Sequence, residues 1–99
     1  MPDKAFAAIY RWQVDPAQED AFRDRWTRGT ERLKALGGLG SCLCRGEGGD
    51  FVAFARWPSE AARAEAFAAL GPREPWPGVL AFEETKLSVE ADLLVQPDS

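Results

Sequence analysis

Apolar side chains fill most of both sides of a strand predicted over Lys4–Val14. One side carries Ala5, Ala7 and Ile9, followed by Arg11. The other side is apolar throughout and consists of Phe6, Ala8, Tyr10, Trp12 and Val14. A strand that is apolar on both sides needs cover on both faces of its sheet. We therefore expect helices on one face and a second copy of the chain on the other.

The stretch after this strand has the features of an amphipathic helix. Asp15 is suited to cap the helix, Pro16 to occupy its first position, and Gln18 to complete a capping box. One apolar stripe then recurs at helical spacing, made of Phe22, Trp26, Gly29, Leu33 and Leu36. The charged residues between these, Arg25 among them, are expected on a solvated face. Gly37 and its neighbouring glycine end the helix.

The middle of the chain predicts a β-hairpin followed by a second helix. The apolar runs Leu39–Arg45 and Phe51–Trp57 flank Gly46–Asp50, which reads as a turn. Ser59 can cap the alanine-rich Ala61–Leu70, a sequence that forms a helix at low entropic cost. This strand-to-helix corner repeats the Arg-Trp pair found 45 residues earlier. The repeat indicates either an internal duplication or two ordinary corners of the same kind.

The end of the chain predicts a loop and a last strand. Residues 71–78 are too rich in proline for regular structure, and Trp76 within them would cover the core or anchor an interface. Val79–Val89 reads as a strand, and Leu93–Val95 as a further short edge strand, on this sheet or on a partner's. The order β-α-β-β-α-β predicts an α+β, ferredoxin-like fold. Its four-stranded antiparallel sheet would carry both helices on one face.

Composition narrows the classes of protein to which this chain can belong. Ninety-nine residues suit a single domain over 1–99. A net charge of −4 argues against a nucleic-acid partner, which requires a basic surface. No apolar run approaches the roughly 20 residues of a membrane-spanning helix, and the first residues lack the pattern of a signal peptide. We expect a soluble cytoplasmic protein.

The chain contains no histidine, and this absence excludes several kinds of site. Ser-His and Cys-His nucleophiles, most zinc sites and a histidine-ligated haem all require that residue. Cys42 and Cys44 would point to the same face of their strand. They read as two small buried apolar residues, with a redox pair as the alternative.

Two stretches with the same strand-to-helix layout resemble a known family. Residues 10–22 read Tyr-Arg-Trp-Gln-Val-Asp-Pro-Ala-Gln-Glu-Asp-Ala-Phe, with Trp26 following, and residues 51–62 read Phe-Val-Ala-Phe-Ala-Arg-Trp-Pro-Ser-Glu-Ala-Ala. Together they resemble the antibiotic biosynthesis monooxygenase-like family of dimeric α+β barrels. That family shows a proline near the start of its first helix and a strand that ends in tryptophan before its second.

The resemblance implies a homodimer whose ligand site lies between the helices and the sheet of each subunit. Family members include cofactor-independent oxygenases of polyketide-derived phenols, quinol monooxygenases and haem-degrading enzymes. Trp57 occupies the position of the tryptophan with which haem-degrading members distort their substrate, and Tyr10 stands where they place an asparagine. Their haem-binding histidine has no counterpart near Phe67, which argues against haem degradation. The resemblance thus implies a monooxygenase that needs neither metal nor flavin.

A cofactor-free oxygenase must hold a small aromatic molecule, such as a phenol or hydroquinone, in apolar surroundings and favour its anion. Tyr10 could donate a hydrogen bond to the substrate, and Arg11, Arg45 or Arg56 could face its charge. We assign the catalytic role to Trp57 and Tyr10. Substrate binding is assigned to the remaining aromatic walls and two strand arginines, namely Trp12, Trp26, Phe54, Arg56 and Arg11.

Each of these residues also has a purely structural interpretation. Trp26 and Trp57 could belong to the core, and Tyr10 could be a sheet residue with a hydrated hydroxyl. The strand arginines could pair with Glu83 or Glu84. The competing function is accordingly a non-catalytic ligand-binding or structural dimer. An open cavity of roughly 300 Å³ would favour the enzyme, and a space filled by the aromatic side chains would exclude it.

Overall fold

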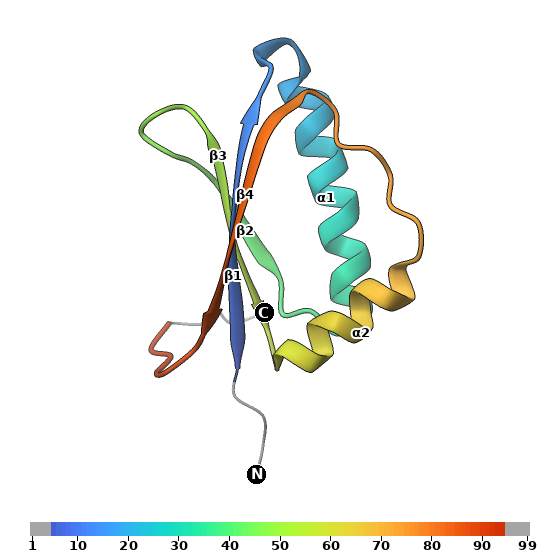
Figure 1. The fold of residues 1–99 in the computed structure, drawn as a ribbon, viewed down its shortest axis with the longest axis vertical. Helices are drawn as coiled ribbons and strands as arrows, with labels where there is room; N and C mark the ends of the chain where they lie inside the picture. The colour runs from blue at the N-terminus through green and yellow to red at the C-terminus, as the bar shows by residue number, and fades with distance from the viewer. Residues whose placement is uncertain (1–4, 95–99) are drawn as a thin grey trace.

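The computed structural model describes residues 5–94 and contains four strands and two α-helices within that range (Figure 1). In chain order the elements are β1 (Phe6–Val14), the short 3-10 helix η1 (Pro16–Gln18), α1 (Glu19–Ala35), β2 (Ser41–Arg45), β3 (Phe51–Trp57), α2 (Glu60–Leu70) and β4 (Val79–Ser88). This succession confirms the predicted β-α-β-β-α-β order.

The strands form one antiparallel sheet in the order β2-β3-β1-β4. Both helices lie on one face, α1 along the strands and α2 across one end of them (Figure 1). The ferredoxin-like α+β fold is therefore confirmed. At the centre of the sheet, Tyr10 of β1 lies opposite Ala53 on one side and Glu84 on the other. Residues directly opposite share a face, so this register decides which side chains meet beneath the helices.

Side-chain caps begin the helical segments, as the sequence predicts. The Asp15 carboxylate accepts a hydrogen bond from the backbone N–H of Ala17 at 3.0 Å, and Ser59 Oγ accepts one from Ala62 at 3.0 Å. The predicted capping box is absent, because Pro16–Gln18 form a separate 3-10 turn and Gln18 makes no side-chain capping bond. The long helix consequently begins at Glu19.

The core lies between the sheet and the helices. Phe22 of α1 is fully buried, stacks on Phe51 with ring centroids 4.9 Å apart, and meets the edge of Trp12 at 5.2 Å. A second cluster at the α2 end consists of Phe6, Ala8, Trp57 and Ala66. Trp76 covers the first cluster, with its ring 5.4 Å from those of both Trp12 and Phe22. The role of core cover predicted for Trp76 matches this position.

The environments of four residues differ from those expected. The charge of Arg25 predicts a position on the solvated face of α1, but Arg25 is only 6% exposed because the 71–78 loop folds over it. Leu36, at the end of the predicted apolar stripe, is instead 40% exposed.

Cys42 and Cys44 share a face as predicted, but both are exposed, because β2 is an edge strand and no helix covers that side. Their Sγ atoms lie 3.7 Å apart.

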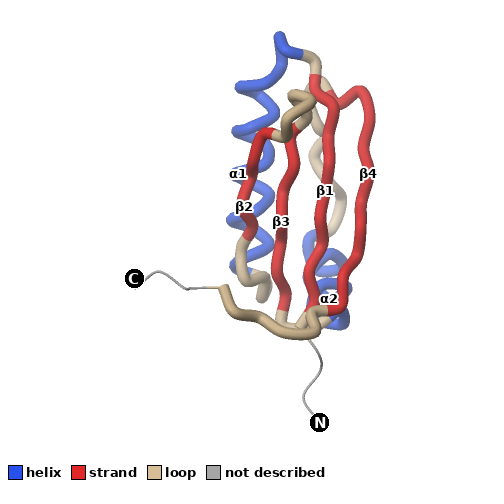
Figure 2. Tube along the Cα trace, turned by 90° about the vertical axis from the view of Figure 1, so that its left-hand side faces the viewer, coloured by secondary structure: helices blue, strands red, loops and turns tan. Residues whose placement is uncertain are grey.

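The chain after β4 crosses one end of the helix-free face (Figures 1 and 2). The short edge strand expected there is absent from its described part, since Asp92–Leu94 has no regular structure, and Val95 lies outside the described residues. Asp92 forms an ion pair with Arg56 of β3. This pair fixes the segment across the sheet instead of along an edge.

The second face of the sheet is apolar at its centre, as the sequence predicts. Figure 2 views this face, with the helices behind the sheet. The register places Ile9, Val52 and Phe54 together on it, beside the two cysteines. All three side chains are partly exposed. Among residues 5–94, no helix is long and apolar enough to cross a membrane.

Candidate active site

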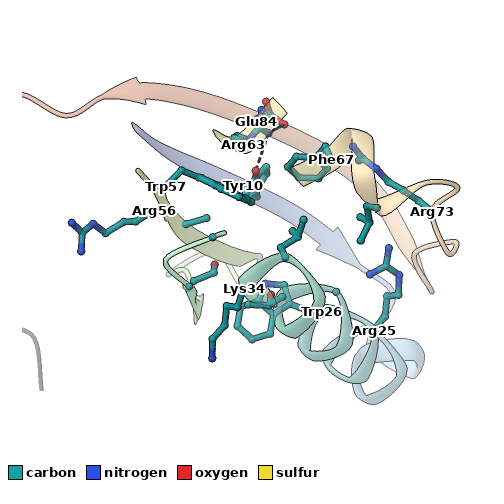
Figure 3. A pocket seen from close by; sticks show the side chains of 18 of the residues that line it. Tyr10, Arg25, Trp26, Lys34, Arg56, Trp57, Arg63, Phe67, Arg73 and Glu84 are labelled. Atoms are coloured by element: carbon teal, nitrogen blue, oxygen red, sulfur yellow. Dashed lines mark hydrogen bonds and ion pairs between the residues drawn. The ribbon is translucent and has the colours of Figure 1, made fainter. Parts of the chain in front are cut away.

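A pocket of about 170 Å³, partly open to solvent, lies between the sheet and the helices (Figure 3). Every strand, both helices and the 71–78 loop contribute to its wall. Trp12, Trp26 and Trp57 line this space without filling it. The volume is below the roughly 300 Å³ typical of larger ligand sites. It suits a single aromatic ring, since a cavity of about 150 Å³ accommodates benzene.

A hydrogen-bonded group forms the inner end of the pocket. Arg63 of α2 points down to the sheet, where its Nη2 donates to the Tyr10 hydroxyl at 2.9 Å and lies 3.2 Å from Glu84 Oε2 (Figure 3). Glu84 reaches this place because β4 sets it directly opposite Tyr10. The Arg63 side chain is 14% exposed, so the guanidinium acts in surroundings where charge is weakly screened.

Three buried polar atoms in residues of the pocket wall have no hydrogen-bond partner among residues 5–94. They are Ser41 Oγ, Trp57 Nε1 and Arg63 Nε, and all three residues line the pocket. An unpartnered buried polar atom costs about 1–3 kcal/mol, so such atoms are rare in folded proteins. Two of the three are N–H donors and the third is a hydroxyl. Because all three atoms are inaccessible to water, they lie behind the surface of the pocket wall, and a guest would reach them only if a neighbouring side chain moved.

Aromatic rings enclose the space around this polar end. Tyr10 stacks with Trp12 at 5.7 Å and with Phe82 at 6.1 Å between ring centroids. On the opposite side, the Trp57 ring lies 6.0 Å from that of Phe67. An aromatic ligand would thus contact ring faces and edges on several sides, the arrangement that aromatic pairs prefer.

The outer end of the pocket is formed by arginines and the 71–78 loop. Arg25 donates from Nε and Nη2 to the carbonyl oxygen of Glu74 at 3.3 and 3.1 Å, and its guanidinium lies 4.1 Å from the centre of a Trp76 ring. Arg73 lies over Phe67 at 4.4 Å. Burial lowers the pKa of Arg25, while the charge of Glu74 acts in the opposite direction. Arginine nevertheless stays charged at neutral pH.

The structure brings five of the seven predicted site residues to the pocket. Tyr10, Trp57, Trp12 and Trp26 present their rings to it. Arg56 also contributes to the wall, but its guanidinium points away from the pocket and pairs with Asp92 (Figure 3). Trp57 combines both interpretations given above, because it is 3% exposed in the core and still lines the cavity.

Phe54 and Arg11 do not reach the pocket. Phe54 pairs with Ile9 and Arg11 with Val52, positions that alternate with the buried ones and therefore face away from the helices. Arg11 lies 3.6 Å from Asp50 on that side. Arg45 is likewise engaged elsewhere, in an ion pair with Glu19. Strand arginines thus do pair with acids, but with partners other than Glu83 or Glu84.

Sequence reasoning did not identify three polar residues of the pocket wall. From the sequence alone, no role is assigned to Arg63 or Ser41, and Glu84 is proposed only as an ion-pair partner for strand arginines. A signal for Arg63 was present, because it is the one basic residue in the alanine-rich α2. A long cation on the helix that faces the sheet can reach across to it, and only the packing of α2 shows that it does.

The residues at the pocket do not fit a metal or a haem. Within residues 5–94, no group of three or more histidine, cysteine, aspartate or glutamate residues is placed to bind a metal ion. The sequence lacks the histidine that haem-degrading family members use. A cavity of about 170 Å³ is also far too small for a porphyrin.

The sequence matches no protein-family model and no curated protein. The structure, however, is similar to that of SnoaB, a cofactor-independent oxygenase from Streptomyces nogalater, with a TM-score of 0.69 and 17% identity over 91% of this chain and 97% of that one. It is also similar to a monooxygenase encoded by ActVA-Orf6 of Streptomyces coelicolor, in complex with nanaomycin D. The TM-score is 0.69, with 22% identity over 94% of each chain.

A third similar structure belongs to a haem degrader, MhuD from Mycobacterium tuberculosis, with two haems in its active site. Its TM-score is 0.67, with 19% identity over 89% of this chain and 98% of that one. Identities this low establish the fold alone, and the three proteins comprise an oxygenase, a monooxygenase and a haem degrader. The chain has the fold of the antibiotic biosynthesis monooxygenase-like proteins.

Proposed function

We propose that this protein is a cofactor-independent monooxygenase that acts on a small aromatic substrate, a phenol or hydroquinone with a single ring. The observation that carries this proposal is the inner end of the pocket, where the guanidinium of Arg63 and the hydroxyl of Tyr10 lie within an aromatic enclosure. The similarity in fold to cofactor-independent oxygenases supports the same reaction class.

Arg63 has the position required to favour the anionic form of the substrate. Its Nη2 is held by Tyr10 and Glu84, so the guanidinium is fixed beside the space that a substrate would occupy. A fixed positive charge beside a phenol lowers the pKa of that phenol. Glu84 is the one carboxylate in the described pocket wall and would receive the proton. Tyr10 and Trp57 would orient the ring and complete the set of hydrogen bonds.

The reaction then needs only dioxygen as its second substrate. Deprotonation makes the ring electron-rich, and a hydrogen-bearing ring carbon ortho or para to the oxygen donates electrons to dioxygen and forms a hydroperoxide. Loss of water from that hydroperoxide gives a quinone. In balance, one phenol and one dioxygen yield one quinone and one water, with one oxygen atom retained in the product. The apolar walls would keep bulk water from this intermediate.

The proposed functional unit is a homodimer in the cytoplasm. The helix-free face carries Ile9, Val52 and Phe54, and these apolar side chains are partly exposed to water in a monomer. Pairing two such faces would cover these side chains in both copies at once. Each copy would keep its own pocket, since the pocket lies on the other side of the sheet.

A second candidate function is binding of a small aromatic molecule without chemistry. The cavity volume of about 170 Å³ favours it, because multi-ring substrates of the kind that polyketide pathways produce would not fit. Arg63 and Tyr10 would then serve recognition alone. The two candidates differ in whether bound ligand consumes dioxygen.

Oxygen uptake with a panel of anthrones and hydroquinones tests the proposed activity. We expect uptake with single-ring hydroquinones, and a reduction of about tenfold or more in both Tyr10→Phe and Trp57→Phe, since each removes a polar group from the site. Glu65→Gln, an exposed substitution on α2 away from the pocket, is the matched control. Absence of uptake with every compound, despite binding, would favour the non-catalytic candidate. Equal rates in the wild type and both aromatic variants would show that neither Tyr10 nor Trp57 has a catalytic role.

A further inference from the structure

The charge of the pocket is opposite to that of the chain as a whole. The chain has a net charge of −4. The described pocket wall nevertheless contains five basic residues and a single acidic one: Arg25, Lys34, Arg56, Arg63 and Arg73 against Glu84. A positively charged pocket in a protein with a net negative charge favours the binding of negatively charged ligands.

The five cations are not equally available to a ligand. Lys34 lies 3.5 Å from Glu31, and Arg56 pairs with Asp92, so both charges are directed away from the cavity. Arg63 shares its charge with Glu84. Arg73, in contrast, has no ion pair to any acid among residues 5–94, and stacks only on Phe67. At the outer end of the pocket, the positive charge of Arg73 is therefore not neutralised by any acidic side chain among the described residues.

Arg25 reinforces the positive charge at that end. Its Nε and Nη2 atoms are occupied by the Glu74 carbonyl, and the Glu74 carboxylate lies 4.0 Å away, closer to Arg28 at 2.7 Å. Nη1 of Arg25 makes no hydrogen bond within the described part of the chain and lies against Gly29, another residue of the wall. A guanidinium held at two of its nitrogens is preorganised to use the third.

The two ends of the pocket are separated by the width of one aromatic side chain. Arg63 lies 4.8 Å and Arg73 lies 4.4 Å from the centroid of the Phe67 ring. Figure 3 shows Phe67 between them, with Tyr10 and Glu84 on the Arg63 side and Arg25 on the Arg73 side. A single ring with substituents at both ends could therefore contact both guanidinium groups.

We infer that the substrate is an aromatic carboxylate, a hydroxylated benzoate whose hydroxyl lies at Arg63 and Tyr10 and whose carboxylate lies at Arg73 and Arg25. This inference rests on the proposed function, because it names the substrate class of the same site. Guanidinium groups bind carboxylates through paired, charge-assisted hydrogen bonds. The carboxylate satisfies the uncompensated charge at the outer end, and the hydroxyl lies beside the Arg63 guanidinium and the Tyr10 hydroxyl at the inner end.

Binding measured without turnover provides the test. Under anaerobic conditions, tryptophan fluorescence would be titrated with 4-hydroxybenzoate and with 4-hydroxybenzamide, which has nearly the same shape and no charge. We expect the carboxylate to bind about tenfold or more tightly at low ionic strength. The advantage should shrink when about 0.5 M salt is added, because salt screens partly exposed charges. Equal affinity for the two compounds would overturn the inference.

Two arginine variants locate the effect. Arg73→Gln should remove most of the difference in affinity between the benzoate and the benzamide, and leave the affinity for the benzamide nearly unchanged. Arg73 is exposed and makes no ion pair to another element among the described residues, so its loss should not disturb the fold. Arg23→Gln is the control, because Arg23 is also an exposed arginine but pairs with Glu19 and Asp20 outside the pocket. An undiminished advantage in Arg73→Gln would contradict the inference.

Failure of this inference can be told apart from failure of the proposed function. If neutral hydroquinone supports oxygen uptake while the benzoate and the benzamide bind with equal affinity, the oxygenase activity is supported and the carboxylate ligand is contradicted. If the benzoate binds in the arginine-dependent manner and no compound consumes dioxygen, the ligand class stands and the protein is a binding protein.

Discussion

Gly78 shows how a single residue joins the loop over the pocket to the sheet. Its φ of +67° lies in the region that favours glycine, and its carbonyl oxygen accepts a hydrogen bond of 2.8 Å from the N–H of Asp15. A Cβ placed on Gly78 would collide with the side chain of Gln18. The loop that carries Trp76 can therefore approach the start of the helical segment only with glycine at this position.

We predict that Gly78→Ala destabilises the protein by about 1–3 kcal/mol, because it adds both backbone strain and a steric clash. Gly48→Ala serves as the control: Gly48 has no positive φ, and a Cβ there would meet no other atom within 4 Å. Urea denaturation of both variants would measure the difference. Similar midpoints for the two would show that the loop tolerates a side chain at position 78.

At the same scale, the sequence identified the rings of the site better than its charges. Tyr10 and Trp57 could be predicted as pocket residues from the family resemblance and their aromatic character, and strand pairing places both on the face that the helices cover. Arg25 and Arg63 could not, because a charged side chain on a helix reads as solvated unless the packing partner is known. The partners here are a backbone carbonyl 49 residues away and a tyrosine 53 residues away.

At the scale of elements, an ion pair connects the start of α1 to the end of β2. Arg45 donates from Nη1 and Nη2 to the two carboxylate oxygens of Glu19, each at 3.0 Å. This bidentate geometry is the strong form of the interaction. The hydrogen bonds from Arg45 lower the pKa of Glu19 below its usual range.

This pair predicts a specific dependence of stability on pH. A carboxylate whose pKa is depressed by folding stabilises the protein above its unfolded pKa, and the contribution is lost as the pH falls through the folded value. Wild-type stability should therefore decline below about pH 4.5, and the decline should be shallower in Glu19→Gln, which should be slightly less stable at pH 7. Thermal unfolding between about pH 3 and 7 would measure this.

The control for this experiment is Glu65→Gln, since Glu65 is exposed on α2 and makes no ion pair among the described residues. Its curve should run parallel to that of the wild type. If Glu19→Gln also runs parallel, the ion pair does not contribute to the pH dependence.

At the scale of the whole molecule, the sheet has two different apolar faces. The helices and the 71–78 loop cover one and enclose the pocket there. The other carries Ile9, Val52 and Phe54 and is crossed only at one end by the segment after β4 (Figure 2). An apolar face of this kind in a soluble protein is typical of an interface between subunits.

We predict that sedimentation at micromolar concentration gives twice the mass of one chain. Phe54→Lys should weaken the dimer by about tenfold or more, because it would bury an unpaired charge at the interface. Leu36→Lys is the control, since Leu36 is an exposed apolar residue at the end of α1, in the helical layer. A wild-type monomer at this concentration would contradict the assignment of the second face.

The local pattern of the sequence by itself determined the order of the elements, their approximate ends and the two faces of the sheet. These properties follow from side-chain periodicity, capping residues and turn residues, all of which act over a few positions. Only the tertiary structure decided which of the two faces the helices cover. That choice excludes Phe54 and Arg11 from the pocket and brings Arg63, Glu84 and Ser41 to it. Register between strands and the placement of α2 over the sheet are long-range properties, and they bring together residues from positions 10, 41, 63 and 84 that no local pattern connects.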